Sequence, residues 1–339
     1  MTLAVALPNW VGDAVMATPA LRALRARFPE DRIVAVVRPY VRPVLDPNPW
    51  TDAFLEVEPS AGGLWDAVRR LKAERAEIGI LLPNSFRSAL LFFLAGVKHR
   101  IGYLRGGRGL MLTDGVPAPR EGKRFLPVPQ ISYYLRLVEI LGAPTADRRM
   151  ELFPTEADEA DAEAAYAAAG LEAGRTLLLC PGAAFGPSKA WPVPHWAHLA
   201  RGARERFGLE SAILCGPSDA GVASEIVEAA DGRCATFHDK GINLASARAV
   251  VRRARVLVAI DSGLRHYAAA FGRPVVALFG PTDIRWTETW HAKEVRLQAA
   301  LPCEPCQKPV CPLGTTECMG KIAPEEVLDA LDEALARDS

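Results

Sequence analysis

The stretch over residues 256–282 carries the pattern of a strand, a tight turn, a short helix and a second strand. Its first part, Val256–Ile260, is an almost continuous apolar run, which suits a strand buried on both faces of a parallel sheet. The next residues, Asp261, Ser262 and Gly263, are typical of turns and helix N-caps. A strand–helix–strand unit of this kind leaves backbone N–H groups unpaired at the start of its helix, where anions bind. The stretch therefore predicts a parallel α/β fold with an anion site.

The acidic side chain at that turn narrows the kind of ligand. A carboxylate at Asp261 would repel a phosphate placed directly on it, so we expect it to face hydroxyl groups beside the phosphates. A ligand that carries both phosphates and several hydroxyl groups is a nucleotide-sugar. The alternative is that Asp261 and Ser262 only cap the helix and hold no ligand.

Strand-like and helix-like segments alternate along both halves of the chain, and 339 residues are enough for about two domains. Alternation of this kind predicts doubly wound parallel sheets. We therefore expect two Rossmann-like domains that face each other across a cleft, over residues 1–153 and 175–339, with a polar connector helix over 154–174. Strands are expected at 3–7, 33–37, 53–57, 78–82, 176–180, 212–215, 256–260 and 275–279, and helices at 63–75, 85–95, 194–207, 219–230, 243–253 and 325–336.

Several functional classes lack their sequence signatures. Neither half has a GxGxxG after its first strand, which counts against a dehydrogenase, and the Walker phosphate-loop spacing is absent. No basic segment precedes the first short strand, so we expect no signal peptide. The longest apolar run, residues 89–97, is too short to span a bilayer. We therefore expect a cytoplasmic protein.

Charge is unevenly distributed although the net charge is zero. Residues 1–150 hold 21 Lys and Arg against 14 Asp and Glu, whereas residues 151–339 hold 19 against 26. The basic surplus is densest over 98–124, which suits either a solvated surface or a site for an anionic partner such as a phosphorylated glycolipid. The segment lacks the interleaved aromatic residues of a single-strand binder, so we expect no nucleic acid partner.

The second half opens with a strand that runs into a loop of small residues and then a single lysine. Gly182, Ala183 and Ala184 would let a ligand approach the backbone, and Lys189 offers a compact positive charge for a diphosphate. The alternative is that Lys189 is an ordinary solvated side chain.

The turn after the next strand repeats this pattern with Gly216, Ser218 and Asp219. In Rossmann-like folds a turn at this place commonly contacts the base or ribose of a nucleotide, although it can equally be an ordinary capped turn. We expect the strand-end turns that carry Lys189, Asp219 and Asp261 to converge on one rim of the second half.

Asp13 follows the first strand of the chain and lies in a loop or short first turn, at the matching rim of the first half. A carboxylate there suits a general base, and the alternative is helix capping. His266 lies one turn into the helix after Asp261, so it either reaches the same site or is a core residue.

Four cysteines fall within sixteen residues in the spacing C-x2-C-x4-C-x6-C: Cys303, Cys306, Cys311 and Cys318. In a cytosolic protein such a group favours a metal over disulfides, and four sulfur ligands leave no open position for catalysis. The pattern therefore suggests a structural zinc site, or else a proline-shaped loop with reduced thiols.

Several motifs in this order resemble those of one family. They are Asn9-Trp10-Val11-Gly12-Asp13 with Thr18-Pro19, Asn84 to Ser88, Pro181-Gly182-Ala183 with Lys189 and Trp191-Pro192, Asp261 to Leu264 with His266, Phe279 to Thr282, and Cys311 to Gly314. Over nearly the whole chain the sequence resembles the ADP-heptose:lipopolysaccharide heptosyltransferases of glycosyltransferase family 9, and the type II branch most of all.

The resemblance implies a GT-B fold and an inverting, metal-independent transfer of heptose from ADP-L-glycero-β-D-manno-heptose onto the lipopolysaccharide inner core. Asp13 would deprotonate the acceptor hydroxyl, and Lys189 would hold the diphosphate with Gly182, Ala183 and Ala184. The donor's sugar and phosphates would lie at Asp261, Ser262, Gly263, Leu264 and His266, and its adenosine near Gly216, Ser218 and Asp219.

The resemblance also implies an anionic glycolipid acceptor and no cofactor besides the ADP-sugar substrate. Asn9, Arg87, Arg100 and Arg105 would then face the acceptor, and a peripheral contact with the inner membrane is expected on its cytoplasmic face. The sequence departs from the family at three places. Ala184 and Phe185 stand where hydroxyl side chains are usual, Arg265 replaces an apolar residue and could add a phosphate contact, and Thr315 stands where a His is frequent.

Three other interpretations stay open at this point. A family member with another donor or acceptor, a GT-B-shaped nucleotide-sugar epimerase, and a non-catalytic nucleotide-sugar-binding module would each share much of this pattern.

Overall fold

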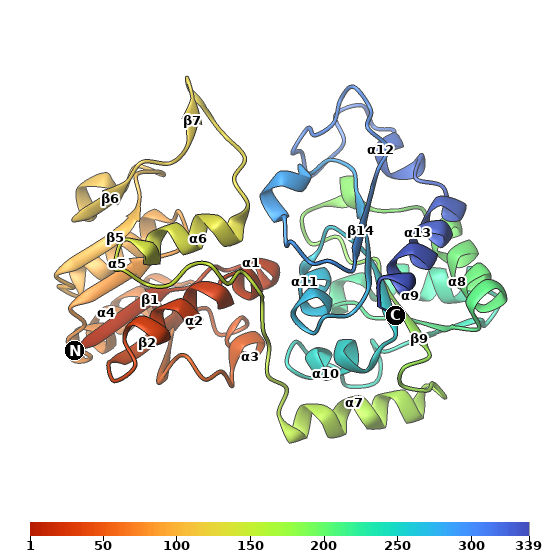
Figure 1. Cartoon of the computed structure of the whole chain (residues 1–339), viewed down its shortest axis with the longest axis horizontal. Coiled ribbons are helices and arrows are strands. Elements are labelled where there is room, and N and C mark those ends of the chain that lie inside the picture. The colour runs from red at the N-terminus through yellow and green to blue at the C-terminus, as the bar shows by residue number, and fades with distance from the viewer. Residues whose placement is uncertain (339) are drawn as a thin grey trace. The chain divides into compact units, whose positions relative to one another are not determined.

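The computed structural model describes residues 1–338, and the chain separates into two compact units. The first comprises Met1–Phe153 with Arg285–Thr289, and the second comprises Pro154–Ile284 with the residues from Trp290 onward. Each unit is built around a six-stranded sheet with helices on both faces (Figure 1).

The first sheet has the strand order β3-β2-β1-β4-β5-β6, and all its strands are parallel. The order reverses between β1 and β4, as in Rossmann folds, where ligands bind beyond the carboxyl ends of the strands. The strands are β1 (Thr2–Ala6), β2 (Arg32–Val37), β3 (Ala53–Glu56), β4 (Ile78–Leu81), β5 (His99–Tyr103) and β6 (Asp114–Val116), and β7 (Arg120–Glu121) with β8 (Arg124–Phe125) form a separate antiparallel pair.

The helices of the first unit follow the sheet's strands in chain order, as the alternating pattern predicts. They are α1 (Val11–Met16), α2 (Thr18–Arg27), α3 (Arg42–Leu45), α4 (Ala61–Ala73), α5 (Phe86–Leu94), the 3₁₀ turn η1 (Gly109–Met111) and α6 (Gln130–Glu139).

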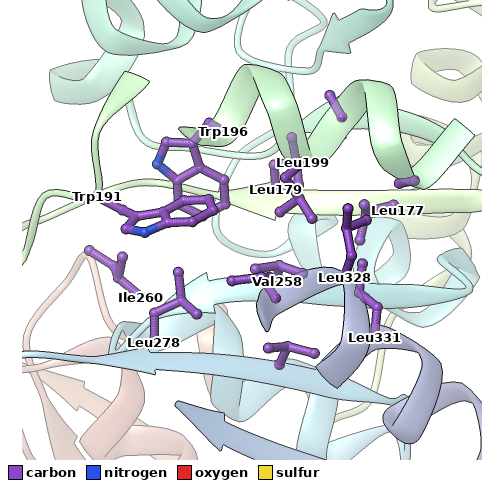
Figure 2. Packing of buried hydrophobic residues seen from close by; sticks show 14 of the residues in the cluster. Leu177, Leu179, Trp191, Trp196, Leu199, Val258, Ile260, Leu278, Leu328 and Leu331 are labelled. Atoms are coloured by element: carbon purple, nitrogen blue, oxygen red, sulfur yellow. The ribbon is translucent and has the colours of Figure 1, made fainter. Parts of the chain in front are cut away.

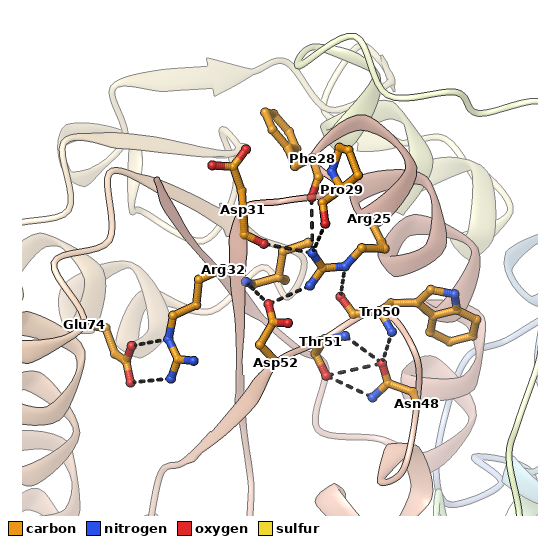
Figure 3. Close-up of polar contacts among 11 residues, drawn as sticks. Arg25, Phe28, Pro29, Asp31, Arg32, Asn48, Trp50, Thr51, Asp52 and Glu74 are labelled. Atoms are coloured by element: carbon orange, nitrogen blue, oxygen red, sulfur yellow. Dashed lines mark hydrogen bonds and ion pairs between the residues drawn. The ribbon is translucent and has the colours of Figure 1, made fainter.

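Polar contacts close the amino-terminal edge of this sheet (Figure 3). Asp52 accepts hydrogen bonds from the Ile33 N–H at 2.7 Å and from Arg25 Nη2 at 2.6 Å. Burial alone would raise the pKa of Asp52, but these two bonds outweigh it, so the pKa lies below its usual value. Next to it, Asn48 Oδ1 accepts from the backbone N–H groups of Trp50 and Thr51. Since protein groups satisfy one another at this edge, a ligand site is expected at the opposite, carboxyl-terminal edge of the sheet.

The second sheet repeats the same topology, with the parallel order β11-β10-β9-β12-β13-β14. Its order reverses between β9 and β12. Its strands are β9 (Thr176–Cys180), β10 (Glu210–Ile213), β11 (Cys234–Thr236), β12 (Val256–Ile260), β13 (Val275–Phe279) and β14 (Glu294–Gln298).

The segment predicted as a connector contains helix α7 (Glu156–Ala168). It packs against α10 (Ser246–Arg253) through a buried ion pair of 2.7 Å between Arg248 and Asp158, and the Tyr166 hydroxyl donates to the Val250 carbonyl at 3.0 Å. These contacts make α7 part of the second unit. The helices are α7 (Glu156–Ala168), α8 (Val193–Phe207), α9 (Ala220–Ala229), α10 (Ser246–Arg253), α11 (Gly263–Ala270), α12 (Glu317–Gly320) and α13 (Pro324–Ala336), with 3₁₀ turns η2 (Pro187–Lys189), η3 (Pro217–Asp219) and η4 (Ile284–Thr287).

The core of the second unit lies between its sheet and helices α8 and α13 (Figure 2). Leu177, Val258 and Leu278 from three strands pack toward Leu328 of α13. The indole rings of Trp191 and Trp196 meet edge to face at 4.9 Å, next to this cluster. A core of this kind holds the strand ends rigid, which is what a site at those ends requires.

No helix within residues 1–338 has both the length and the apolar character needed to cross a membrane.

Candidate active site

The turns after β9, β10 and β12 lie side by side at the carboxyl edge of the second sheet, since β9 is the neighbour of both other strands. This is the point where the strand order reverses, which is the usual ligand site of such sheets. The structure thus brings the turns that carry Lys189, Asp219 and Asp261 together.

Lys189 lies at the centre of this edge and is only 7% exposed. Its Nζ donates to the backbone carbonyl of Asp261 at 2.6 Å and to Asp261 Oδ2 at 2.8 Å. The Phe185 ring centroid lies 5.0 Å from the same Nζ, in the range of a cation–π contact. The lysine is therefore held in place and is not an ordinary solvated side chain.

The Asp261 carboxylate contacts protein groups at both oxygens. Oδ2 also accepts from the Thr282 hydroxyl at 2.8 Å, and Oδ1 pairs with Arg265 Nη1 at 3.1 Å. Burial alone would raise the pKa of Asp261, but the charges of Lys189 and Arg265 and the hydrogen bonds outweigh it, so the pKa lies well below its usual range. In the structure this carboxylate anchors Lys189, and its predicted contact with ligand hydroxyls stays a prediction.

Arg265 does not make the phosphate contact that the sequence suggested. Its side chain is fully buried and pairs with Glu294 of β14 as well as with Asp261. The second Glu294 oxygen pairs with Arg296 Nε at 3.1 Å. Arg265 therefore serves the interior of the protein, because a guanidinium without exposed surface cannot reach a bound phosphate.

The start of helix α11 keeps backbone donors available. Ser262 occupies the N-cap position but makes no side-chain capping hydrogen bond, so the interpretation of a purely capping serine is wrong. Gly263 and Leu264, whose N–H groups lie in the first turn, follow closely after Asp261 in the chain, and Asp261 is the partner of Lys189. This combination of a helix N-terminus and a fixed cation suits an anion.

His266 lies one turn further along α11 and is buried, with its Nδ1 lacking a hydrogen-bond partner among residues 1–338. Burial, followed by the charge of Arg265, lowers the pKa of His266 to about 3. The imidazole is therefore neutral at pH 7.

Asp219 ties the β10 turn to the β9 turn. Its Oδ1 accepts from the Ala183 N–H at 3.4 Å, and a Cβ placed on Gly182 would lie only 2.9 Å from its Oδ2. A larger residue at position 182 would displace the Asp219 carboxylate from this position. Gly216 and Ser218 lie in the same turn, and Ser218 Oγ donates to Asp219 Oδ2 at 3.3 Å. The neighbouring Ala184 is exposed.

The segment that contains the four cysteines supports the lysine loop. Ser188 donates through its hydroxyl to the Lys308 carbonyl at 2.6 Å and through its N–H to the Pro309 carbonyl at 3.1 Å. Gly186 has φ +149°, and a Cβ there would lie 2.3 Å from the Pro309 carbonyl oxygen. The loop before Lys189 is thus seated directly on this segment.

The cysteines themselves are not arranged as a zinc site. Cys303 is exposed, Cys306 and Cys311 are half-buried, and Cys318 is buried. Within residues 1–338 no three His, Cys, Asp or Glu side chains are gathered so as to hold a metal ion. The thiols as placed do not fit the metal that their spacing suggested, and no step below depends on one.

In the first unit, Asp13 lies in the short helix α1, directly after β1. Its Oδ1 accepts a hydrogen bond of 3.1 Å from the hydroxyl of Tyr134, a buried residue of α6. Burial, together with the Asp13 charge, raises the pKa of Tyr134 well above its usual value, so the phenol stays protonated and keeps donating. Nothing in the sequence around Tyr134 signals this contact.

The four predicted acceptor residues fall into different places. Asn9 and Arg87 line one small hollow of about 50 Å³ at the carboxyl ends of β1 and β4. Arg105 follows the carboxyl end of β5. Arg100 lies at the amino-terminal end of β5, where its Nε donates to the Met111 carbonyl at 2.6 Å. The structure therefore groups Asn9 with Arg87 and separates Arg100 from them.

Comparison with solved structures defines the class of protein. The chain superimposes on E. coli ADP-heptose LPS heptosyltransferase II with a TM-score of 0.81 and 27% identity, covering 100% of this chain and 99% of that one. Two units with Rossmann-like sheets, matched over the full chain by that solved structure, define a glycosyltransferase of the GT-B fold. The sequence pattern of glycosyltransferase family 9 (heptosyltransferase) matches residues 64–317, and the chain belongs to that family.

Curated relatives extend this similarity over the full length. Lipopolysaccharide heptosyltransferase 2 of Escherichia coli strain K12 is 28% identical over 355 aligned residues, which cover 100% of this chain and 99% of that protein. Lipooligosaccharide heptosyltransferase 2 of Haemophilus influenzae is 30% identical over 355 residues, with 99% and 100% covered. Membership in a glycosyltransferase family disfavours the epimerase interpretation.

Proposed function

We propose that this glycosyltransferase moves heptose from ADP-L-glycero-β-D-manno-heptose onto the lipopolysaccharide inner core, with inversion at the anomeric carbon. The two curated relatives named above are heptosyltransferases, and each is similar to this chain over its full length. This similarity supports heptose as the sugar and a lipopolysaccharide as the acceptor. The observation that carries the proposal is the Lys189–Asp261 pair beside the uncapped start of α11.

The donor's diphosphate would bind at this pair. Lys189 and the first N–H groups of α11 supply positive charge where the leaving ADP gains negative charge, so no metal is needed for the departure. Turnover should accordingly persist in EDTA, and a rate that falls with chelator and returns with a divalent cation would refute metal independence.

Asp13 would act as the general base on the acceptor. The acceptor oxygen forms a bond to the anomeric carbon, the bond from that carbon to the ADP oxygen breaks, and the acceptor proton passes to the Asp13 carboxylate. The Tyr134 hydroxyl holds the carboxylate in one orientation. Asn9, Arg87 and Arg105 would face the acceptor, and the position of Arg100 makes it a weaker candidate for this role.

We further propose a peripheral contact with the cytoplasmic face of the inner membrane. Phe93, Leu104 and Leu110 are exposed by 48%, 40% and 99%, and Lys98 and Arg100 lie in the same part of the first unit. Exposed apolar side chains among cations are typical of surfaces that bind anionic bilayers.

The deciding experiment compares wild type with Asp13→Asn in transfer from ADP-heptose to a truncated lipopolysaccharide acceptor, followed by mass spectrometry. Loss of the base should lower turnover about a hundredfold or more while ADP-heptose binding is retained. Asp66→Asn, on the exposed face of α4, is the matched control. Undiminished turnover of Asp13→Asn would exclude the base role.

Donor identity is tested separately by a thermal-shift screen of ADP-, UDP-, GDP- and dTDP-sugars, because a ligand that binds the native state raises its melting temperature. A larger shift with another nucleotide would replace the ADP-sugar assignment. Tight ADP-heptose binding without transfer to any glycolipid would favour a non-catalytic binding module.

A further inference from the structure

The first unit contains a second hollow, which includes Arg105 but neither Asp13 nor any residue of the donor site. It measures about 430 Å³ and lies beyond the carboxyl end of β5, within one compact unit. The hairpin β7–β8, whose first strand is labelled in Figure 1, contributes Arg120 and Phe125 to its wall. Asn84 and the loop residues Arg105, Gly106, Gly107 and Arg108 also line it.

Two of the three arginines at this hollow share one aromatic ring. The guanidinium carbons of Arg105 and Arg120 lie 4.0 and 4.6 Å from the Phe125 ring centroid. Within residues 1–338 neither side chain forms an ion pair with a carboxylate. Two like charges on one ring repel each other, and an anion between them would relieve that repulsion.

The third arginine, Arg108, is fully buried in the wall. Its Nε donates to the Tyr103 carbonyl at 3.1 Å, its Nη2 to Asn84 Oδ1 at 3.2 Å, and its Nη1 to the Pro83 carbonyl. All these acceptors are neutral, and burial lowers the pKa of Arg108 to about 10. A buried cation without a counter-charge is costly and makes the adjoining hollow electropositive.

The backbone of the loop is shaped for this arrangement. Gly106 and Gly107 have φ of +70° and +71°, a conformation that favours glycine, and a Cβ on Gly106 would lie 2.9 Å from the Asn84 carbonyl oxygen. The loop thus presses on the turn after β4 and leaves its own glycine backbone exposed.

We infer that this hollow binds an oxyanion of the acceptor, a phosphomonoester or a carboxylate, between Arg105 and Arg120. The inference rests on the proposed function, in which the acceptor is an acidic glycolipid. The volume exceeds that of a phosphate group, so a sugar that carries the anion also fits. Planar guanidinium groups suit either oxyanion, because each can donate two parallel hydrogen bonds.

The test uses the Arg105→Gln/Arg120→Gln double variant, which leaves the buried Arg108 intact. Its control is Arg69→Gln/Arg136→Gln, which removes the same charge from exposed positions of α4 and α6. Each protein is assayed with the natural acceptor, with the acceptor after phosphatase treatment, and with the acceptor after reduction of its carboxyl groups.

The hollow predicts that the Arg105/Arg120 variant raises the acceptor KM about tenfold or more, with the donor KM within twofold of wild type. The difference from wild type should shrink on the acceptor that lacks the bound anion, which identifies phosphate or carboxylate as its source. The inference is overturned if the variant resembles the control, or if its defect is the same on all three acceptors.

A measurement without turnover separates this inference from the proposed function. Inorganic phosphate is titrated into ¹⁵N-labelled wild type, and the amide signals of Gly106 and Gly107 should shift in a saturable way that is lost in the Arg105/Arg120 variant. If wild type transfers sugar to no glycolipid, the proposed function fails. Saturable shifts of the Gly106 and Gly107 signals would still support the oxyanion site, and their absence would refute it.

Discussion

Lys189 Nζ lies 2.8 Å from Asp261 Oδ2, across 72 positions of sequence, and also donates to the backbone carbonyl of Asp261. The lysine is therefore fixed before any donor arrives. A fixed cation needs no reorganisation when charge develops on a leaving group, and this is the main source of electrostatic stabilisation in active sites.

Asp261→Asn should therefore harm both stability and donor binding. The change leaves Lys189 and Arg265 buried without their shared carboxylate, and breaking a buried pair costs about 3–5 kcal/mol. Urea unfolding at pH 7 measures this loss, and the donor KM should rise at the same time. Asp329→Asn removes a carboxylate from an exposed pair with Arg206 and should cost about 1 kcal/mol or less. Equal losses in the two variants would contradict the anchoring role.

The Arg265–Glu294 pair should behave as a unit. Arg265→Leu leaves a carboxylate buried in β14 and should cost about 3 kcal/mol or more, whereas Arg265→Leu combined with Glu294→Leu should cost less than the sum of the single changes. A double-mutant cycle in urea measures the coupling, which we expect at about 1–3 kcal/mol. Additive free energies would show that the two side chains act independently.

Tyr134→Phe tests the hydrogen bond to Asp13. The hydroxyl holds the Asp13 carboxylate in one orientation, so its loss should lower kcat several-fold while the donor KM stays close to that of wild type. Tyr103→Phe is the control, because the Tyr103 hydroxyl is buried in the same unit but donates to the Tyr133 carbonyl. An unchanged kcat in Tyr134→Phe would mean that this hydrogen bond does not position Asp13 for the reaction.

The proposed membrane contact predicts a role for Leu110, which is 99% exposed in η1. Leu110→Asp should weaken co-sedimentation with vesicles that contain anionic lipid several-fold, because it removes apolar surface and adds a negative charge. Val222→Asp changes an exposed apolar residue of the second unit and serves as the control. Equal binding by both variants would remove Leu110 from the contact.

The sheets and the ends of their strands follow from local pattern. Apolar runs such as Val256–Ile260 and Thr176–Cys180 predict buried parallel strands from their amino-acid types alone. The residues that follow each run must then lie at the carboxyl edge of the sheet. Short strands with polar or weakly apolar sequences, such as β5 and β14, are not signalled in this way. Their strand state comes from pairing with a neighbour, which single-sequence patterns do not contain.

Partners from distant segments account for what the sequence did not predict. Glu294 meets Arg265 only because β14 is placed beside β13, and Tyr134 meets Asp13 only because α6 packs on α1. For the same reason, the contacts of Asp261 with Lys189 and Arg265 were not predicted. Asp261 and Arg265 are polar and lie near a predicted anion site, and only the packed structure shows that both side chains face the interior.

His266 makes the stability of the second unit depend on pH in a defined direction. Its pKa falls from 6.5 to about 3 on folding, so below pH 6.5 the unfolded chain takes up a proton that the folded chain does not. The unfolded state therefore gains stability as the pH falls from 6.5 toward 3. The contribution of His266 is fully present above pH 6.5 and is lost on acidification by up to about 1.4 kcal/mol for each pH unit.

His266→Gln removes the titrating group while keeping a polar side chain of similar length. We expect the free energy of unfolding of wild type to fall more steeply than that of the variant between pH 6.5 and 4.5, in urea titrations at matched ionic strength. His198→Gln makes the same substitution at an exposed histidine and serves as the control. Parallel pH dependences for wild type and His266→Gln would mean that His266 gains its proton equally in the folded and unfolded chains, and would place its imidazole in contact with water.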